Sequence, residues 1–178
     1  MELSYQKIPV EFLSSLPEGI KFVNKHGRGY LIVDEIYCPQ GHDLVVESVR
    51  IHGEPSIRIE VDTGASRGLV FVDSFWGGHA KLYGFIPVIS DGMPILRAFC
   101  PECGVDLVVE RECNFEGCGS GSSIVLALPG GRNKIYVCAR LGCAGHHMEI
   151  VELPEELAGQ VDEINYFGAQ PDDVFQGI

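Results

Sequence analysis

The chain has few basic residues and no long apolar run, and each shortage excludes a class of function. Its 13 Lys and Arg residues stand against 25 Asp and Glu residues, which gives a formal net charge of −12. The phosphate backbone of a nucleic acid would repel such a chain, so nucleic acid is not an expected partner. No apolar run is long enough to span a bilayer, so we expect no membrane association.

A secretory signal is also missing from the first residues. Residues 1–9 carry Glu2 and Lys7 among scattered apolar residues, without the basic and apolar regions of a signal peptide. We therefore expect a cytoplasmic protein. In that reducing compartment its seven cysteines would serve as metal thiolates rather than as disulfides. Seven is an odd number, so at least one cysteine must have a different role.

Glycine and proline, by contrast, are abundant. Twenty-two glycines and ten prolines divide the chain into short segments, which favours strands and turns over long helices. One short helix is predicted at residues 9–16, between two prolines, and a hairpin is predicted from residues 20–23 and 30–33. A final strand is expected at 148–153, a short helix from Pro154, and a loosely held acidic end from residue 160. The composition therefore predicts a mainly β fold.

The most specific motif is a Cys-Pro-x-Cys-Gly turn, from Cys100 to Gly104. It places two thiolates on one loop, and Gly104 can adopt the positive φ that the turn needs. Cys138 and Cys143 are the candidate second pair, and four thiolates suit a structural zinc ion. Residues 100–143 resemble the zinc ribbons, whose knuckle is Cys-Pro-x-Cys-Gly followed by a strand. The second pair departs from that family, because its spacer is four residues where two are usual.

An internal repeat extends this interpretation to the rest of the chain. Residues 38–47 and 100–110 both read Cys-Pro, a glycine turn, then Asp-Leu-Val-Val-Glu, and residues 56–61 align more weakly with 123–128. The repeat predicts a mainly β protein of two tandem zinc-ribbon-like β units with short flanking helices. We divide the chain into an N-terminal helix and β-hairpin (1–37), a first ribbon-like unit (38–98), a second (99–153) and an acidic C-terminal extension (154–178).

The alignment also suggests a second metal site, in the first unit. It places Asp73 opposite Cys138 and His79 opposite Cys143, within a residue. The ligand set of the first unit would then be Cys38, His42, Asp73 and His79. Such a mixed set could hold a catalytic zinc ion with one position left to water, whose pKa the metal lowers. Alternatively, the first unit is a decayed repeat that has lost its metal.

A third candidate site has no counterpart in the first unit. Cys113 and Cys118 could supply two thiolates to another metal ion, with His146 or His147 as further ligands. They could instead be a reduced pair or a redox-active disulfide. His52, a single histidine between apolar residues and glycine, has no predicted role.

A short string at residues 60–66 has another resemblance. Asp62-Thr63-Gly64 and the residues around it resemble the catalytic loop of the retroviral-type aspartic proteases, in which a homodimer pairs two aspartates. The equivalent residues of the second unit are 129–132, Pro-Gly-Gly-Arg. Both segments are typical of hairpin tips, where Asp and Gly are favoured by turn geometry alone.

The sequence favours a zinc-binding protein with a structural four-cysteine site. The chain as a whole would bind one, two or three zinc ions. It would act in protein–protein association, as an accessory subunit or as a homo-oligomer. One alternative is a zinc-dependent enzyme or metal-handling protein that uses the mixed site. Two others are electron transfer through iron, since the Cys100 turn also resembles that of rubredoxin, and proteolysis through Asp62.

Overall fold

The computed structural model describes residues 8–78, 80–86, 95–143 and 145–164. As predicted, the fold is mainly β, with several antiparallel sheets and two short helices. Helix α1 (Val10–Leu13) is shorter than the predicted segment, because Pro9 lies at its start and Pro17 follows closely. Strands β1 (Ile20–Lys25) and β2 (Arg28–Val33) form the predicted hairpin.

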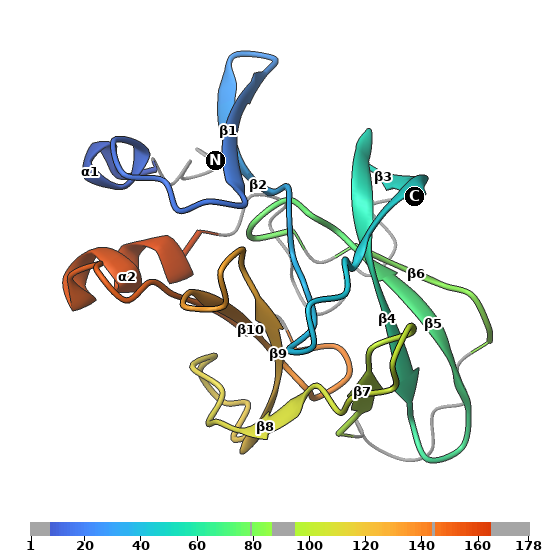
Figure 1. The fold of residues 1–178 in the computed structure, drawn as a ribbon. Coiled ribbons are helices and arrows are strands. Elements are labelled where there is room, and N and C mark those ends of the chain that lie inside the picture. Colours follow the sequence, from blue (N-terminus) through green and yellow to red (C-terminus); the bar gives the residue numbers. More distant parts are fainter. Residues whose placement is uncertain (1–7, 79, 87–94, 144, 165–178) are drawn as a thin grey trace, which may run out of the picture.

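Two larger sheets make up the rest of the molecule (Figure 1). The first contains β3 (Val45–Ile51), β4 (Glu54–Asp62), β5 (Arg67–Val72) and β6 (Lys81–Tyr83), and β7 (Arg97–Phe99) also pairs with β4. The second contains β8 (Val108–Glu110), β9 (Ser122–Ala127), β10 (Lys134–Cys138) and β11 (His146–Glu149). Helix α2 (Glu155–Asp162) follows β11.

The strand order shows the repeat as two copies of one antiparallel meander. The first sheet runs β3-β4-β5-β6 and the second runs β8-β9-β10-β11. The registers also agree, because Ile57 pairs with Val72 in the first sheet and Ile124 pairs with Val137 in the second. Asp73 and Cys138, which follow these valines, therefore occupy equivalent positions.

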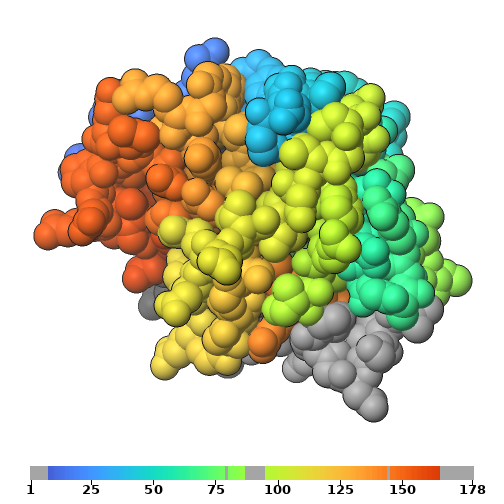
Figure 2. Space-filling model, turned by 60° about the horizontal axis from the view of Figure 1, so that its bottom comes forward, coloured from blue at the N-terminus to red at the C-terminus, as the bar shows by residue number. Residues whose placement is uncertain are grey.

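In each copy, the segment just before the Cys-Pro knuckle pairs with the second strand of the other copy's sheet. Tyr37, before the first knuckle, exchanges two backbone hydrogen bonds of 2.8 Å with Ala127 in the second sheet. Phe99, before the second knuckle, pairs with Glu60 in the first sheet. On the surface, the light-blue segment around residue 40 lies against the yellow-green segment around residue 100 (Figure 2). The reciprocal pairing thus brings the two knuckles together.

The inward faces of the two sheets share one core. In β4 the buried residues alternate with more exposed ones, as at Ile57, Ile59 and Val61, and Ile124 and Leu126 of β9 lie in the same cluster. This alternation is what the two-residue period of a strand requires when one face is buried. The core therefore spans both units rather than closing within each.

The C-terminal region differs from its prediction. Strand β11 lies at His146–Glu149, earlier than the expected 148–153. Helix α2 extends past residue 160, and Val161 and Ile164 are fully buried. The indole of Trp76 donates a 2.8 Å hydrogen bond to the carbonyl of Val161. Apolar packing thus holds this segment as far as residue 164; residues 165–178 lie outside the described part.

Candidate metal centres

The first group of potential metal ligands joins the two knuckles. Its four ligand atoms lie within 4.8 Å of one another and come from Cys38, His42, Cys100 and Cys103. The Sγ atoms of Cys38 and Cys103 are 3.9 Å apart, and Cys38 Sγ is 3.4 Å from His42 Nδ1. Ligands around a tetrahedral zinc ion would be about 3.8 Å apart for two sulfurs and about 3.6 Å for sulfur and nitrogen. The group therefore has the dimensions of a tetrahedral zinc site. We call it centre one.

The two knuckles that form centre one share one backbone design. In the first, the N–H of Cys38 donates to the carbonyl of His42, and the N–H of Gly41 donates to the carbonyl of Cys38. Gly41 has a φ of 90°, in the region that favours glycine. The side chain of Asp43 then accepts the N–H of Val45 at 2.9 Å, which closes the turn before β3.

The second knuckle repeats these bonds with one residue more. The N–H of Cys100 donates to the carbonyl of Val105, and the N–H of Gly104 donates to the carbonyl of Cys100. Asp106 accepts the N–H of Val108, as Asp43 does in the first knuckle. By these bonds Val105 is the counterpart of His42, and Cys103 is the added residue. Each knuckle therefore offers two ligands at different positions on a similar turn.

The electrostatics of centre one favour a bound cation. Burial alone would raise the pKa of Cys38, but hydrogen bonds from the backbone and the side chain of His42 lower it to about 7. Burial raises the pKa of Cys100. A thiolate that is partly removed from water needs a positive partner, and a metal ion bound by all four ligands would provide it.

The second group, centre two, lies within the second unit. Its ligand atoms also lie within 4.8 Å of one another and come from Cys113, Cys118, Cys138 and Cys143. Two Sγ pairs, Cys113 with Cys143 and Cys118 with Cys138, are each 3.6 Å apart. A disulfide bond would need about 2.05 Å, so these are free thiols at the spacing of metal ligands.

Backbone N–H groups point at the sulfurs of centre two. Arg140 and Gly145 donate to Cys138 and Cys143, each at 3.4 Å. A Cβ added to Gly145 would lie 2.4 Å from the Sγ of Cys113, so only glycine allows this approach. Burial raises the pKa of Cys113 to about 11 and raises that of Cys143 further. A metal ion bound by the four sulfurs would stabilise the thiolate forms of Cys113 and Cys143 against this effect of burial.

The grouping of the cysteines differs from the one expected. The sequence suggested a single site of Cys100, Cys103, Cys138 and Cys143, but the structure divides these residues between the two centres. The spacing of cysteines reports which thiolates share a turn. It does not report which turns meet, and here the reciprocal pairing of the units decides that.

The mixed site expected in the first unit is not assembled as predicted. Asp73 lies apart from Cys38 and His42: its Oδ2 is 2.9 Å from Nδ1 of His52, and its Oδ1 accepts the N–H of Phe75. Burial raises the pKa of this carboxyl, although both hydrogen bonds oppose the shift. The other expected ligand, His79, lies outside the described residues.

A histidine–carboxylate pair thus takes the place of centre two in the first unit. Asp73 is the counterpart of Cys138, and Gly78 is the counterpart of Cys143, because both donate their N–H to the residue three positions earlier. A Cβ at Gly78 would meet Asp73 Oδ2 at 2.4 Å. His52 sits in the short turn between β3 and β4, where the second unit has the longer loop with Cys113. That position in the repeat is the signal that could have identified His52.

The two other predicted ligands, His146 and His147, hold helix α2. His146 Nε2 lies 3.1 Å from the carbonyl oxygen of Ile164, and the His146 ring packs edge-on against Trp76. His147 Nδ1 forms a hydrogen bond with the carboxylate of Asp162. In the described part of the chain neither histidine belongs to a four-ligand group. Their role is thus to fasten the helix to β11.

The Asp-Thr-Gly string forms the tip of the β4–β5 hairpin. Asp62 Oδ1 accepts the N–H of Gly64 at 2.8 Å, and Thr63 Oγ1 accepts the N–H of Ser66 at 3.0 Å. These are the local bonds of a turn. Asp62 therefore has a conformational role, and the protease resemblance is confined to the string itself.

Comparison of the chain with models of protein families, with curated proteins and with solved structures finds no match. Neither helix of the described residues has the length and apolar character needed to cross a membrane.

Proposed function

We propose that this chain is a zinc protein in which two structural ions hold two β units together as a scaffold for protein association. The observation that carries the proposal is that each centre brings together four protein ligands. Four ligands close the tetrahedral shell of zinc and leave no position for a reacting water molecule. Such an ion stabilises a fold and does no chemistry.

The ligand types favour zinc at both centres. Structural zinc sites use ligand sets of both kinds: three cysteines with one histidine, as in centre one, and four cysteines, as in centre two. Thiolate sulfur and imidazole nitrogen bind zinc well, whereas magnesium and calcium require oxygen ligands. The knuckle, its following strand and the four-ligand centres support a relationship to the zinc ribbons. In this chain, however, one ribbon-like centre is shared between two units.

The two ions would have different structural tasks. Centre one joins segments that are 65 residues apart, and so would lock the first unit to the second. Centre two joins the loop after β8 to the turn between β10 and β11. The binding free energy of structural zinc, roughly 10 kcal/mol or more at neutral pH, would appear as folding free energy.

The surface supports association with another protein. The net charge of −12 favours a partner with basic residues and disfavours nucleic acid. Large apolar side chains are also exposed, at Val10, Ile86 and Val151, with exposed fractions of 75%, 88% and 56%. A basic protein partner in the cytoplasm, or a second copy of this chain, would cover such residues.

Absorption spectroscopy of the cobalt-substituted protein tests this proposal against the enzyme alternative. The scaffold requires two tetrahedral ions, one with four sulfurs and one with three sulfurs and a nitrogen, and neither spectrum should change when small anions are added. A five-coordinate spectrum, or a spectrum that azide or cyanide shifts, would reveal an open position. Together with catalytic turnover that His42→Ala abolishes, that result would overturn the scaffold proposal.

A further inference from the structure

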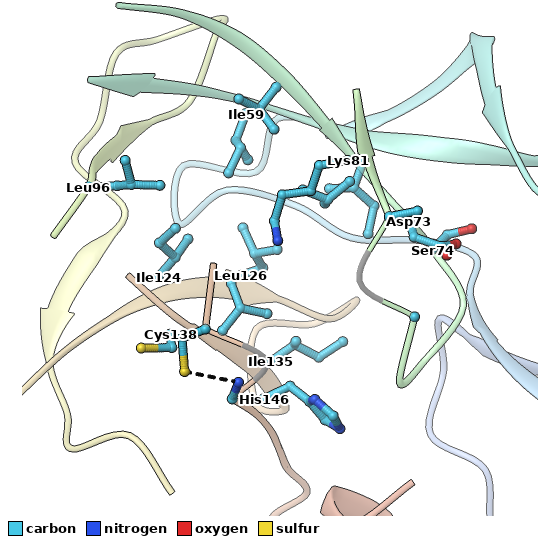
Figure 3. A pocket seen from close by; sticks show the side chains of 18 of the residues that line it. Ile59, Asp73, Ser74, Lys81, Leu96, Ile124, Leu126, Ile135, Cys138 and His146 are labelled. Carbon is cyan, nitrogen blue, oxygen red and sulfur yellow. Dashed lines mark hydrogen bonds between the residues drawn. The ribbon is translucent and has the colours of Figure 1, made fainter. Parts of the chain in front are cut away.

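A cavity of about 110 Å³ lies between the two sheets. Two ligands of centre two, Cys138 and Cys143, form part of one wall. Its walls are mainly aliphatic: Ile59 and Val70 come from the first sheet, and Ile124, Leu126 and Ile135 come from the second. Figure 3 shows Ile59 of the first sheet across the cavity from Ile124, Leu126 and Ile135 of the second. Most of these side chains belong to the shared core, so the cavity is fixed by the packing of one unit on the other.

Lys81 of β6 points its ammonium group into this apolar space (Figure 3). Within the described part of the chain, its Nζ forms no hydrogen bond and no ion pair. Lys81 is half-buried, because part of its side chain lines the cavity and protein atoms surround the rest. Burial consequently lowers the pKa of Lys81, and the Cys143 thiol acts in the opposite direction. A buried ammonium without a partner is costly, and an anion bound in the cavity would stabilise its charged form.

Two further polar groups of the cavity wall have no partner. Nε of Arg140 and Oγ of Ser74 are both buried, and neither forms a hydrogen bond among the described residues. The carboxylate on the wall, Asp73, is already engaged by His52 and by the N–H of Phe75. The groups without a partner are thus the Lys81 ammonium, one N–H of the Arg140 guanidinium and a hydroxyl, all of which can donate to an anionic ligand.

We propose that the cavity binds a small monocarboxylate with a short aliphatic body. The carboxylate would pair with Lys81, and the hydrocarbon would lie among Ile59, Ile124 and Leu126. The volume sets the size, because an apolar cavity of roughly 150 Å³ accommodates benzene and so about 110 Å³ suits a body of three to five carbons. The side chains proposed to bind the ligand are not metal ligands, but Cys138 and Cys143 of centre two also line the cavity, so the site is tested with both metal ions bound.

The test compares isobutyrate with its neutral isostere isobutyramide on the zinc-loaded full chain. Methyl NMR should show saturable shifts with isobutyrate, at Ile124 and Leu126 among others. Isobutyramide should bind at least about tenfold more weakly, because a charge-assisted hydrogen bond is lost. Lys81→Met, which keeps the length and removes the charge, should weaken isobutyrate binding by about tenfold or more. Lys134→Met changes a lysine of β10 outside the cavity and should bind as the unsubstituted chain does.

Three binding results would each overturn the proposal: no saturable shift, equal binding of the acid and the amide, or unchanged binding by Lys81→Met. The comparison of acid and amide needs no substitution, so it decides the matter even if the variant folds poorly. Zinc content, measured on the same samples, separates this site from the metal centres. A Lys81→Met chain that loses zinc would show that Lys81 instead serves centre two, and would also contradict the proposal.

Discussion

The Sγ of Cys38 lies 3.9 Å from the Sγ of Cys103, although 65 residues separate them in the chain. Cys38 belongs to the knuckle of the first unit and Cys103 to the knuckle of the second, so centre one lies at the junction of the two repeats. In the first unit, the position of the other centre is held by the pair of His52 and Asp73. The duplicated chain thus has one ligand group shared between the units, one ligand group within the second unit, and one position in the first unit where a hydrogen-bonded pair takes the place of cysteines.

The division of ligands between the centres predicts how cysteine substitutions combine. Cys103→Ala should remove one zinc ion, Cys143→Ala should remove the other, and the double variant should bind none. If the two residues shared one ion, the double variant would lose no more zinc than either single variant. Metal content per chain by elemental analysis separates these outcomes. Cys103→Ala should also lower the melting temperature sharply, because structural zinc contributes roughly 10 kcal/mol or more.

Gly145→Ala should damage centre two without removing a ligand. The added Cβ would lie 2.4 Å from Cys113 Sγ, so either the turn that holds Gly145 or the loop that holds Cys113 must move. We expect weaker zinc retention in a competition with a chromophoric chelator, with loss of one of two ions. Gly121→Ala is the matched control, because a Cβ there meets no atom within 4 Å. Equal zinc retention by the two variants would contradict the geometry of centre two.

The His52–Asp73 pair should contribute stability without affecting metal content. His52→Ala leaves the buried Asp73 with one partner fewer, which should cost about 1–3 kcal/mol in the free energy of unfolding. His26→Ala is a close control, because His26 also has a positive φ, 54° against 53° for His52, in an exposed hairpin turn. Denaturant unfolding of the zinc-loaded chains measures both. Zinc lost from His52→Ala, or equal unfolding of the two variants, would show that this assignment is wrong.

Asp62 should tolerate asparagine, because its role is to accept a hydrogen bond in a turn. Asp62→Asn keeps the Oδ1 acceptor for the N–H of Gly64, whereas Asp62→Ala removes it and should cost about 0.5–1.5 kcal/mol. Thermal unfolding should therefore distinguish the alanine variant from the asparagine variant. Peptide hydrolysis by the unsubstituted chain that disappears in Asp62→Asn would instead support the aspartic protease resemblance.

Local features of the structure could be predicted from the sequence. The glycine and proline content predicted the mainly β fold, and the Cys-Pro motif marked both knuckles, Cys38 and Cys100, because short turns carry their own signature. The repeat placed Asp73 opposite Cys138, which the strand registers support. All of these depend on residues near one another in the chain.

The packing of one unit on the other could not be predicted in the same way. A repeat defines each copy but says nothing of how the copies meet, and the bonds between Tyr37 and Ala127 follow no local pattern. For this reason the sequence predicts two separate sites for the residues that the structure brings together in centre one. The turn that holds His52 has no local signature of its own, and only its position in the repeat, opposite the loop with Cys113, points to the pairing with Asp73.

The most direct test of the two-centre account is the number of zinc ions per chain, measured by native mass spectrometry on protein purified without chelators. The account predicts two zinc ions bound to each chain, one per centre. A chain that carries a single ion, or none, while remaining folded would contradict it.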